Sequence, residues 1–465
     1  MKKLFGFIFL LAVCMIPMST GTTAKAATKD YTITSTSKPS KTYTKLSSYN
    51  KYTRYYYVFK EILKDCEKNG GGNITVKKGT YTLTNVLCIP SNVTLIFEDG
   101  VTIKKGDKTG TSKLTASRSI FQLIKPSKLT TAKYYSKYNG EKNIKIIGKG
   151  NATLDLQSIQ YSIGFVLGHN QNVSITGITF KNLNTGHFIE MDASKDVSIT
   201  NCSFLDSVES PKHNKEAINI DTPDPLTGGF NSVWSAQDKT PDKNVTIDNC
   251  IFKNIDCAVG THRYSQAQDK TGKYTVNLYH TGITITNSKF YDIRSYVFDV
   301  INWKDVEISN CEISGGSYSK EITSNPATGE TMLWTYYNTV FRLKGINNLT
   351  FKNNSCNNVG SITTTSYIDV TSSDYNALYT DLEFKLSVDN INDLIFNNTY
   401  TDLKNCMIAT CALKLGSIIE DASYSKYIKY GSNIASDRIS MFVGLNYMTL
   451  AESRAAESRA AESKQ

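Results

Sequence analysis

Acidic and basic side chains recur at matching positions in five segments between Phe188 and Lys344. Aligned by their alternating apolar residues, these segments give two columns of outward-pointing positions. The first column contains Glu190, Asn219, Gly260, Asp299 and Arg342. The second contains Asp192, Asp221, His262, Ile301 and Lys344. Closely stacked carboxylates push one another's pKa values apart, so that one stays protonated while another stays ionised. Glycoside hydrolysis requires such a pair, and the columns therefore predict a hydrolytic site.

We expect Asp192 and Asp221 to be the acid and base, with Glu190, Asp299 and His262 in support. Cationic and amide side chains would hold an acidic sugar or stabilise developing negative charge. These are Asn219, Arg263, Arg342 and Lys344. The alternative interpretation is a solvated sheet whose charges form ion pairs between neighbouring strands.

Four further residues near this face are candidates for substrate contact: Glu216, His213, His280 and Trp234. Trp234 lies in an inserted segment and could stack on a sugar ring, because a glycan presents apolar C–H faces to an aromatic. It could equally be a structural plug beneath that segment. We interpret His169 and His187 as turn residues rather than ligands.

A repeated octapeptide positions these columns. VSITNCSF begins at Val197, VTIDNCIF at Val245, ITITNSKF at Ile283 and VEISNCEI at Val306. Near-copies at intervals of a few dozen residues are typical of a solenoid. Strict alternation makes each copy a strand, and no long helical pattern lies between the copies to form βαβ units. The sequence therefore predicts an all-β fold, a right-handed parallel β-helix.

The copies place Cys202, Cys250, Ser288 and Cys311 at one position of successive coils, where we expect an internal ladder of small side chains. A disulfide between Cys202 and Cys250 is geometrically conceivable. The sequence contains no CxxC pair and no zinc-ligand spacing, so no metal site is predicted.

The N-terminal part of the solenoid carries a family resemblance. GGGNITVKKGTY at Gly70–Tyr81, IPSNVTL at Ile89–Leu95 and DGVTI at Asp99–Ile103 resemble the opening of the pectate-lyase-like β-helix superfamily. That superfamily includes pectate lyases, polygalacturonases and related secreted polysaccharide enzymes, and the resemblance covers roughly residues 54–400. The same fold also hosts tailspikes and adhesins, so the resemblance implies the fold more than the reaction.

A narrower resemblance is to the polygalacturonases. These carry acidic residues on consecutive coils, then a histidine, then Arg-x-Lys, the order in which Asp192, Asp221, His262 and the pair Arg342 and Lys344 occur here. The Asn-Thr-Asp, Asp-Asp and Gly-His-Gly motifs of that family are absent, and an extra coil separates His262 from Arg342. The resemblance therefore implies an acidic glycan without assigning the acid and the base.

The remaining segments set the boundaries. A charged start, an apolar run and a small-residue cleavage site predict a signal peptide at residues 1–26 and hence a secreted, extracellular or cell-surface bacterial protein. We expect a leader at 27–53, the β-helix at 54–400 with a short capping helix over Tyr56–Lys68, a C-terminal cap at 401–448 and a low-complexity tail at 449–465. Three insertions, at 223–243, 264–279 and 314–335, are expected to wall a binding site.

The net charge of +10 and pI near 8.9 suit an acidic partner such as a uronic-acid polysaccharide, although a lysine-rich surface is an equally good explanation. No nucleic-acid motif and no membrane span are apparent, and we expect a monomer. Three functions remain open: a glycoside hydrolase without a cofactor, a lyase that uses Ca²⁺ and takes Lys344, Arg342 or Arg263 as its base, and a non-catalytic glycan-binding solenoid.

Overall fold

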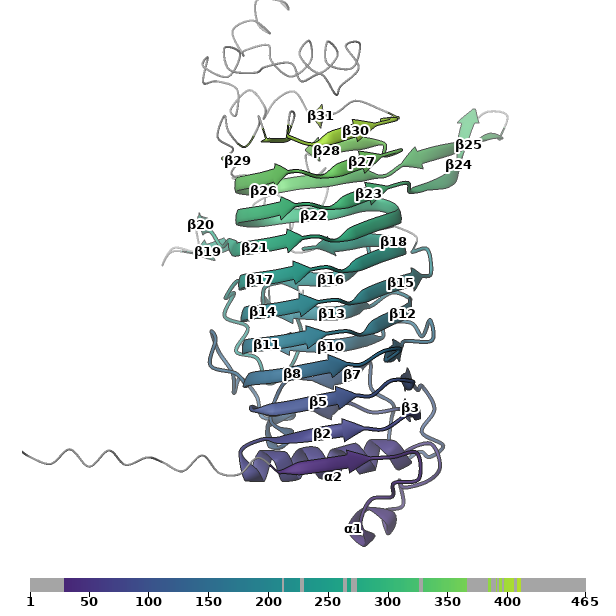
Figure 1. The fold of residues 1–465 in the computed structure, drawn as a ribbon, viewed down its shortest axis with the longest axis vertical. Helices are drawn as coiled ribbons and strands as arrows, with labels where there is room; N and C mark the ends of the chain where they lie inside the picture. Colours follow the sequence, from purple (N-terminus) through teal and green to yellow (C-terminus); the bar gives the residue numbers. More distant parts are fainter. Residues whose placement is uncertain are drawn as a thin grey trace, which may run out of the picture.

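The computed structural model describes residues 29–210, 213–225, 230–261, 266–268, 274–325, 329–365, 384–385, 390, 393–394, 397–404 and 408–410. The chain winds into a stack of parallel coils, a right-handed parallel β-helix (Figure 1). The expected signal peptide and low-complexity tail, and most of the expected C-terminal cap, lie outside the described residues. Within the described part of the chain, no helix is long and apolar enough to cross a membrane.

Each coil contributes one strand to each of three faces. The first face contains β2 (Gly72–Val76), β5 (Val93–Phe97), β8 (Lys142–Gly148), β11 (Gln171–Thr176), β14 (Lys195–Thr200), β17 (Lys243–Asp248), β21 (His280–Thr286) and β29 (Phe384–Lys385). The second contains β3 (Gly79–Leu83), β6 (Val101–Lys105), β9 (Thr153–Asp155), β12 (Thr179–Leu183), β15 (Ser203–Ser207), β23 (Glu312–Ser314), β27 (Ser355–Asn357) and β30 (Thr399–Thr401). The third contains β4 (Leu87–Cys88), β7 (Ser119–Gln122), β10 (Ile163–Gly168), β13 (His187–Asp192), β16 (Glu216–Asp221), β28 (Ser361–Thr365) and β31 (Ile408–Thr410).

Three longer strands pass from one face to the next: β18 (Ile251–Gly260), β22 (Lys289–Ser309) and β26 (Thr339–Lys352). The octapeptide copies pair in the expected register, with Val197 beside Val245 and Val245 beside Ile283. Inward side chains of successive coils therefore stack on like side chains. Phe204 and Phe252 lie face to face with ring centroids 4.7 Å apart, and Phe252 and Phe290 with centroids 4.9 Å apart. This repetition confirms the predicted solenoid.

Asparagine makes the turn between the first and second faces. Asn201, Asn249, Asn287, Asn310 and Asn353 all have φ between 51° and 58°, the left-handed region that asparagine tolerates better than most residues. The residue after each asparagine points inward, and Cys202, Cys250, Ser288 and Cys311 are buried as predicted. The thiols of Cys202 and Cys250 are free, so the conceivable disulfide is not formed.

The first coil is capped by α2 (Arg54–Asn69), which ends at Gly70 with φ +76°. Its buried face includes Phe59 and Leu63, which confirms the predicted capping helix. The expected leader is more ordered than predicted, because β1 (Asp30–Ile33) pairs in parallel with β2 and precedes the short helix α1 (Lys41–Thr44). By adding a strand to the sheet, β1 covers part of the first coil's edge.

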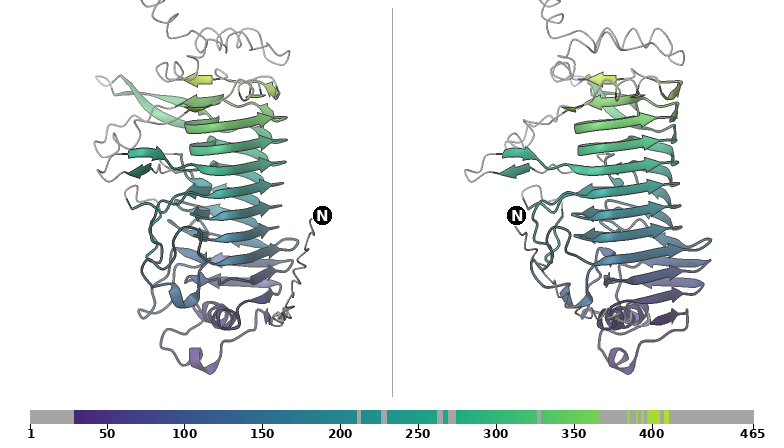
Figure 2. Two further views of the ribbon diagram at one scale, coloured as in Figure 1. Left: turned by 90° about the vertical axis from the view of Figure 1, so that its left-hand side faces the viewer. Right: turned by 60° about the vertical axis from the view of Figure 1, so that its left-hand side comes forward.

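Inserted segments gather along one side of the stack (Figure 2). Two of them are hairpins, β19 (Gln266–Gln268) with β20 (Tyr274–Asn277) and β24 (Ser317–Asn325) with β25 (Glu330–Tyr337). A segment not singled out in the sequence, 123–141, follows β7, contains the short 3-10 helix η1 (Pro126–Lys128) and bonds to segment 230–242 of an insertion. The backbone of Tyr135 donates to Trp234 O at 2.9 Å and accepts from Ala236 N at 2.8 Å.

Candidate active site

The two polar columns occur on the third face. Strand pairing places Glu190 beside Asn219, Asn219 beside Gly260, Gly260 beside Asp299 and Asp299 beside Arg342. In the second column Asp192 pairs with Asp221, and Ile301 with Lys344. His262 and Arg263 lie outside the described residues. The predicted register is thus confirmed wherever the structure describes it.

The side chains of both columns are more deeply buried than we expect for a face that is open to solvent. Glu190 is 5% exposed, Asp299 1%, and Asp192 and Asp221 are fully buried. Part of the cover is the interlocked pair of insertions, since Gly168, the neighbour of Asp192 on β10, packs tightly against the Trp234 indole. Any Cβ at position 168 would overlap that ring.

Trp234 is therefore not an exposed platform for sugar. Only 1% of it is exposed, and it packs against Phe230 and Tyr135 while its Nε1–H donates to Gln122 Oε1 at 3.0 Å. Its burial does not favour the predicted contact with substrate and favours the alternative of a structural plug. The apolar indole takes this place because the insertion would otherwise have no core of its own.

His280 is also misassigned as a substrate contact. It is 1% exposed at the start of β21, where its Nδ1 accepts the backbone N–H of Asp242 at 3.0 Å. Asp242 in turn accepts from Ser194 N at 2.6 Å. The imidazole thus anchors the end of an insertion. His169 has a similar role, bonding through its ring nitrogens to Lys137 O and Ser235 Oγ.

His187, interpreted from the sequence as a turn residue, instead joins the acidic columns. It is the first residue of β13, and its Nδ1–H donates to Glu216 O at 2.7 Å. Its Nε2 lies 3.5 Å from Glu190 Oε2, and its Nδ1 lies 3.8 Å from Glu216 Oε2. Burial lowers the pKa of His187 to about 4, so the imidazole between the two glutamates is neutral at pH 7.

Burial has the opposite effect on the carboxyl groups. It raises the pKa of Glu190 to about 8, although the Asn219 amide that donates to Glu190 Oε1 at 3.2 Å opposes the shift. Burial and then the charge of Asp299 raise the pKa of Glu216 to about 7. The pKa of Asp192 also lies well above its ordinary value, through burial and then through Glu190 and Asp221. Among the described residues, neither carboxylate oxygen of Asp192 has a hydrogen-bond partner.

These shifts predict a stability that falls as pH rises. A carboxyl group with a raised pKa binds its proton more tightly in the folded state, so unfolding becomes easier once pH exceeds its unfolded value near 4.5. The stabilisation from Glu190 is complete below that pH and is lost as pH rises through about 8. We expect the melting temperature to be higher at pH 5 than at pH 8.5. Replacing Glu190 with Gln should flatten that dependence, and an unchanged slope would contradict the shift.

The Arg342 guanidinium forms an ion pair with a neighbouring residue instead of being free to bind a substrate. Its guanidinium donates to Asp299 through Nε at 2.7 Å and also through Nη2, and it lies 4.2 Å from the centre of the Tyr296 ring. Its side chain is 15% exposed. The pair is therefore an internal ion pair, which removes Arg342 from the predicted sugar contacts and Asp299 from the predicted catalytic acids. For Lys344 the structure describes only the backbone position, beside Ile301.

One cavity reaches the acidic columns. It has a volume of about 300 Å³, and it is lined by residues of β7, β10 and β13 and by the insertion. Arg118, Gln122, Tyr161, His187, Glu190 and Asn231 contribute to its lining. Glu190 is the single carboxylate among the described residues that line it, so it is the member of the columns in contact with this space.

The described residues contain no group of three or more His, Cys, Asp or Glu side chains placed to share a metal ion. With Arg342 held by Asp299, the lyase alternative has one fewer free candidate base.

Comparison with known proteins supports the fold. No protein-family model matches the chain. The chain is 26% identical over 258 residues to plasmin and fibronectin-binding protein A of Streptococcus pneumoniae. The match covers 50% of this chain and 35% of that protein, so this chain spans about a third of the length of that protein. Among solved structures it is similar to the Streptococcus pneumoniae surface protein and adhesin PfbA, with TM-score 0.50, 17% identity, and 75% of this chain and 85% of that chain covered.

A second solved structure is the tailspike protein of E. coli bacteriophage HK620 in complex with a pentasaccharide. It matches with TM-score 0.44 and 14% identity, covering 77% of this chain and 60% of that chain. The similarity to PfbA supports the parallel β-helix and does not single out the pectate-lyase-like superfamily.

Proposed function

We propose that the protein is an extracellular or cell-surface β-helix that binds a polysaccharide and hydrolyses a glycosidic bond at the Glu190 cavity. The observation that carries the proposal is a nearly buried carboxyl group, next to a neutral imidazole, that borders a cavity. A carboxyl group that keeps its proton at neutral pH can donate it to the leaving-group oxygen as general acid.

Asp192 is the proposed partner carboxylate. It is two residues beyond Glu190 on β13, on the same side of the strand and about 7 Å along it. Side chains that start this far apart can place their carboxyl groups at the separation of about 6.5 to 9.5 Å that leaves room for a water in inverting enzymes. Asp221 supports Asp192 from the neighbouring strand. Because Asp192 is fully buried and its pKa lies well above the ordinary value, the role requires the bound glycan to displace part of its cover and so restore the ionised form.

Arg118 and Tyr161 support an acidic glycan as the substrate. The guanidinium of Arg118 lies 5.2 Å from the centre of the Tyr161 ring, and 54% of Tyr161 is exposed at the cavity. Thr185 Oγ1 accepts the backbone N–H of Tyr161 at 3.0 Å, which holds Tyr161 at φ +57°. A sugar ring could stack on the tyrosine while its carboxylate binds the arginine.

A second function, a non-catalytic adhesin, is supported by a different observation. The relative with 26% identity is named for binding plasmin and fibronectin, and the similar solved structure is described as a surface adhesin. In that case the third face would bind a glycan or a host protein without cleaving it.

One digest separates the two functions. The protein is incubated with acidic and neutral polysaccharides, with and without EDTA, while new reducing ends and the ultraviolet absorbance of unsaturated uronides are recorded. Hydrolysis predicts reducing ends without absorbance, insensitive to EDTA. Absorbance that EDTA removes would replace the hydrolase with the lyase. Binding without any cleavage would leave the adhesin.

A further inference from the structure

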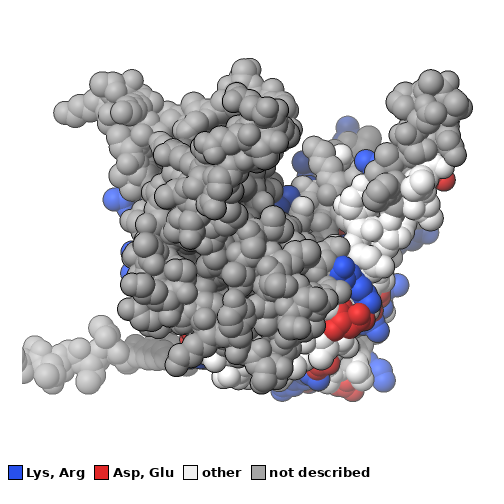
Figure 3. All heavy atoms as spheres, turned by 90° about the horizontal axis from the view of Figure 1, so that it is seen from above, with Lys and Arg blue, Asp and Glu red and all other residues white. Residues whose placement is uncertain are grey.

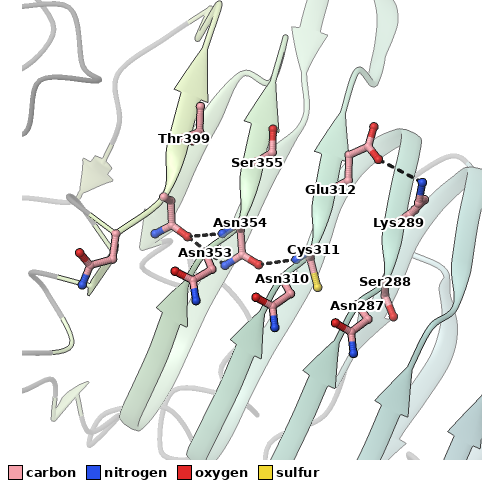
Figure 4. A pocket seen from close by; sticks show the side chains of 12 residues that line it. Asn287, Ser288, Lys289, Asn310, Cys311, Glu312, Asn353, Asn354, Ser355 and Thr399 are labelled. Atoms are coloured by element: carbon pink, nitrogen blue, oxygen red, sulfur yellow. Dashed lines mark hydrogen bonds and ion pairs between the residues drawn. The ribbon is translucent and has the colours of Figure 1, made fainter.

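A second groove runs along the asparagine turn between the first and second faces, away from Glu190 (Figure 4). It has a volume of about 730 Å³ and crosses four successive coils. Its wall on the second face is a row of side chains in strict register: Lys289, Glu312, Ser355 and Thr399. Its other wall is the row of turn asparagines, Asn287, Asn310, Asn353 and Asn397.

The inward amides beneath this groove are fully engaged. Asn354 Oδ1 accepts the N–H of Cys311 at 2.9 Å, and Asn398 Oδ1 accepts the N–H of Asn354 at 2.9 Å. The Asn354 amide group also donates to Ile308 O at 3.1 Å. These buried bonds fix the turn, so the outward amides above them are held in a regular array.

The outward amides divide into two groups. In the earlier coils they bond to the neighbouring coil: Asn249 Nδ2 donates to Asn201 Oδ1, and Asn287 Nδ2 donates to Asp248 Oδ1, both at 2.7 Å. Asn310 and Asn353 have no side-chain hydrogen bond to any described residue, and both are exposed in the groove. Each therefore presents one acceptor and two donors to a ligand.

The groove carries no net charge. Lys289 and Glu312 are its two charged lining residues, and their side chains form an ion pair at 3.3 Å. Elsewhere on the described surface seen from above, basic and acidic side chains also lie next to each other (Figure 3). A polyanion would find no uncompensated cation in this groove. The chemistry favours a neutral ligand rich in hydroxyl groups.

The spacing of the groove favours a polymer. Successive coils are about 4.8 Å apart, so the amides repeat at that interval along the axis. A β-linked pyranose chain advances by about one coil per sugar, whereas an extended peptide advances only about 3.3 Å per residue. We propose that this groove binds a neutral linear glycan parallel to the axis of the β-helix, with the Asn310 and Asn353 amides bonding to hydroxyl groups of adjacent sugars.

The test uses chitohexaose and cellohexaose as neutral probes and hexagalacturonate as the acidic one. Binding to the full chain is measured by calorimetry, and the site is located by protection from hydrogen exchange. We expect a neutral hexasaccharide to bind and to protect segments 286–313 and 352–356, which carry Asn310 and Asn353. Changing Asn310 and Asn353 together to Gly should weaken it about tenfold, the loss expected for two neutral hydrogen bonds. Glycine suits both turns, because it adopts φ near +57° without strain.

The matched control is Asn358→Gly, which removes an exposed asparagine at φ +54° from another turn outside the groove. It should bind the neutral probe as the unmodified protein does. The proposal would be overturned if both neutral probes fail to bind, if protection falls outside segments 286–313 and 352–356, or if the double variant binds equally well. None of these results bears on cleavage at Glu190, which lies on the third face.

Discussion

Glu190→Gln is expected to lower polysaccharide cleavage by at least about 100-fold, the usual contribution of a general acid, while leaving glycan binding within a few-fold. The amide is nearly the same size and can still bond to Asn219, but it has no proton to donate to the leaving oxygen. Initial rates and a binding isotherm on the same polysaccharide separate these two effects. The unmodified protein should also lose activity as pH rises through about 8, where Glu190 loses its proton.

The matched control is Glu98→Gln, which removes a partly exposed carboxylate that pairs with Lys77 on the first coils. It should cleave at the unmodified rate. Full activity in Glu190→Gln would eliminate Glu190 as the acid. A variant that neither binds nor cleaves, but melts at a much lower temperature, would instead assign Glu190 a structural role.

Arg342→Met should destabilise the fold by about 3 to 5 kcal/mol, the cost of leaving one member of a buried ion pair without its partner. Asp299 would then be buried next to Glu216 with no cation beside it, and the charge of each would oppose ionisation of the other. Urea unfolding measures the loss, and hydrogen exchange in β22 and β26 shows whether it is local. Adding Asp299→Leu to the same variant should recover most of the stability.

The comparison pair is Lys289 with Glu312, whose side chains are 52% and 49% exposed. Lys289→Met should leave the urea midpoint nearly unchanged, because water screens a surface pair. A similar small effect for Arg342→Met would mean that Asp299 finds another partner or takes up a proton without strain.

The register of the third face could be predicted because it follows from alternation alone. Within each third-face strand a period of two fixes which side chains share a side, and matching the apolar residues of Phe188–Asp192 to those of Ala217–Asp221 and of the later strands gives the register. This alignment alone predicts that Glu190 lies beside Asn219 and that Asp299 lies beside Arg342, and the structure has both pairings. The same regularity predicted the stacked cysteines.

The burial of the third face could not be predicted, because it depends on inserted segments whose sequences do not belong to the repeat. Trp234 and Tyr135 are about one hundred residues apart in the sequence, and no periodic pattern predicts that they are in contact. His187 could have been found. Extending the strand alignment three residues before Glu190 would have placed it in the column of Glu216, where the structure has it. The signal was present, but the residue preceded the apolar alternation that defined the strand.

The interlocking of the two insertions has a consequence for how the protein can change. Segment 123–141 and segment 230–242 share a short parallel bridge between Tyr135 and Ser235, and each supplies aromatic rings to the small core between them. A coil of the solenoid can be duplicated or lost with little effect on distant coils, because each coil contacts mainly its neighbours. These two loops lack that independence. Lengthening, shortening or grafting one of them into a related β-helix requires a matched change in the other, so in evolution and in engineering they are inherited as a single unit.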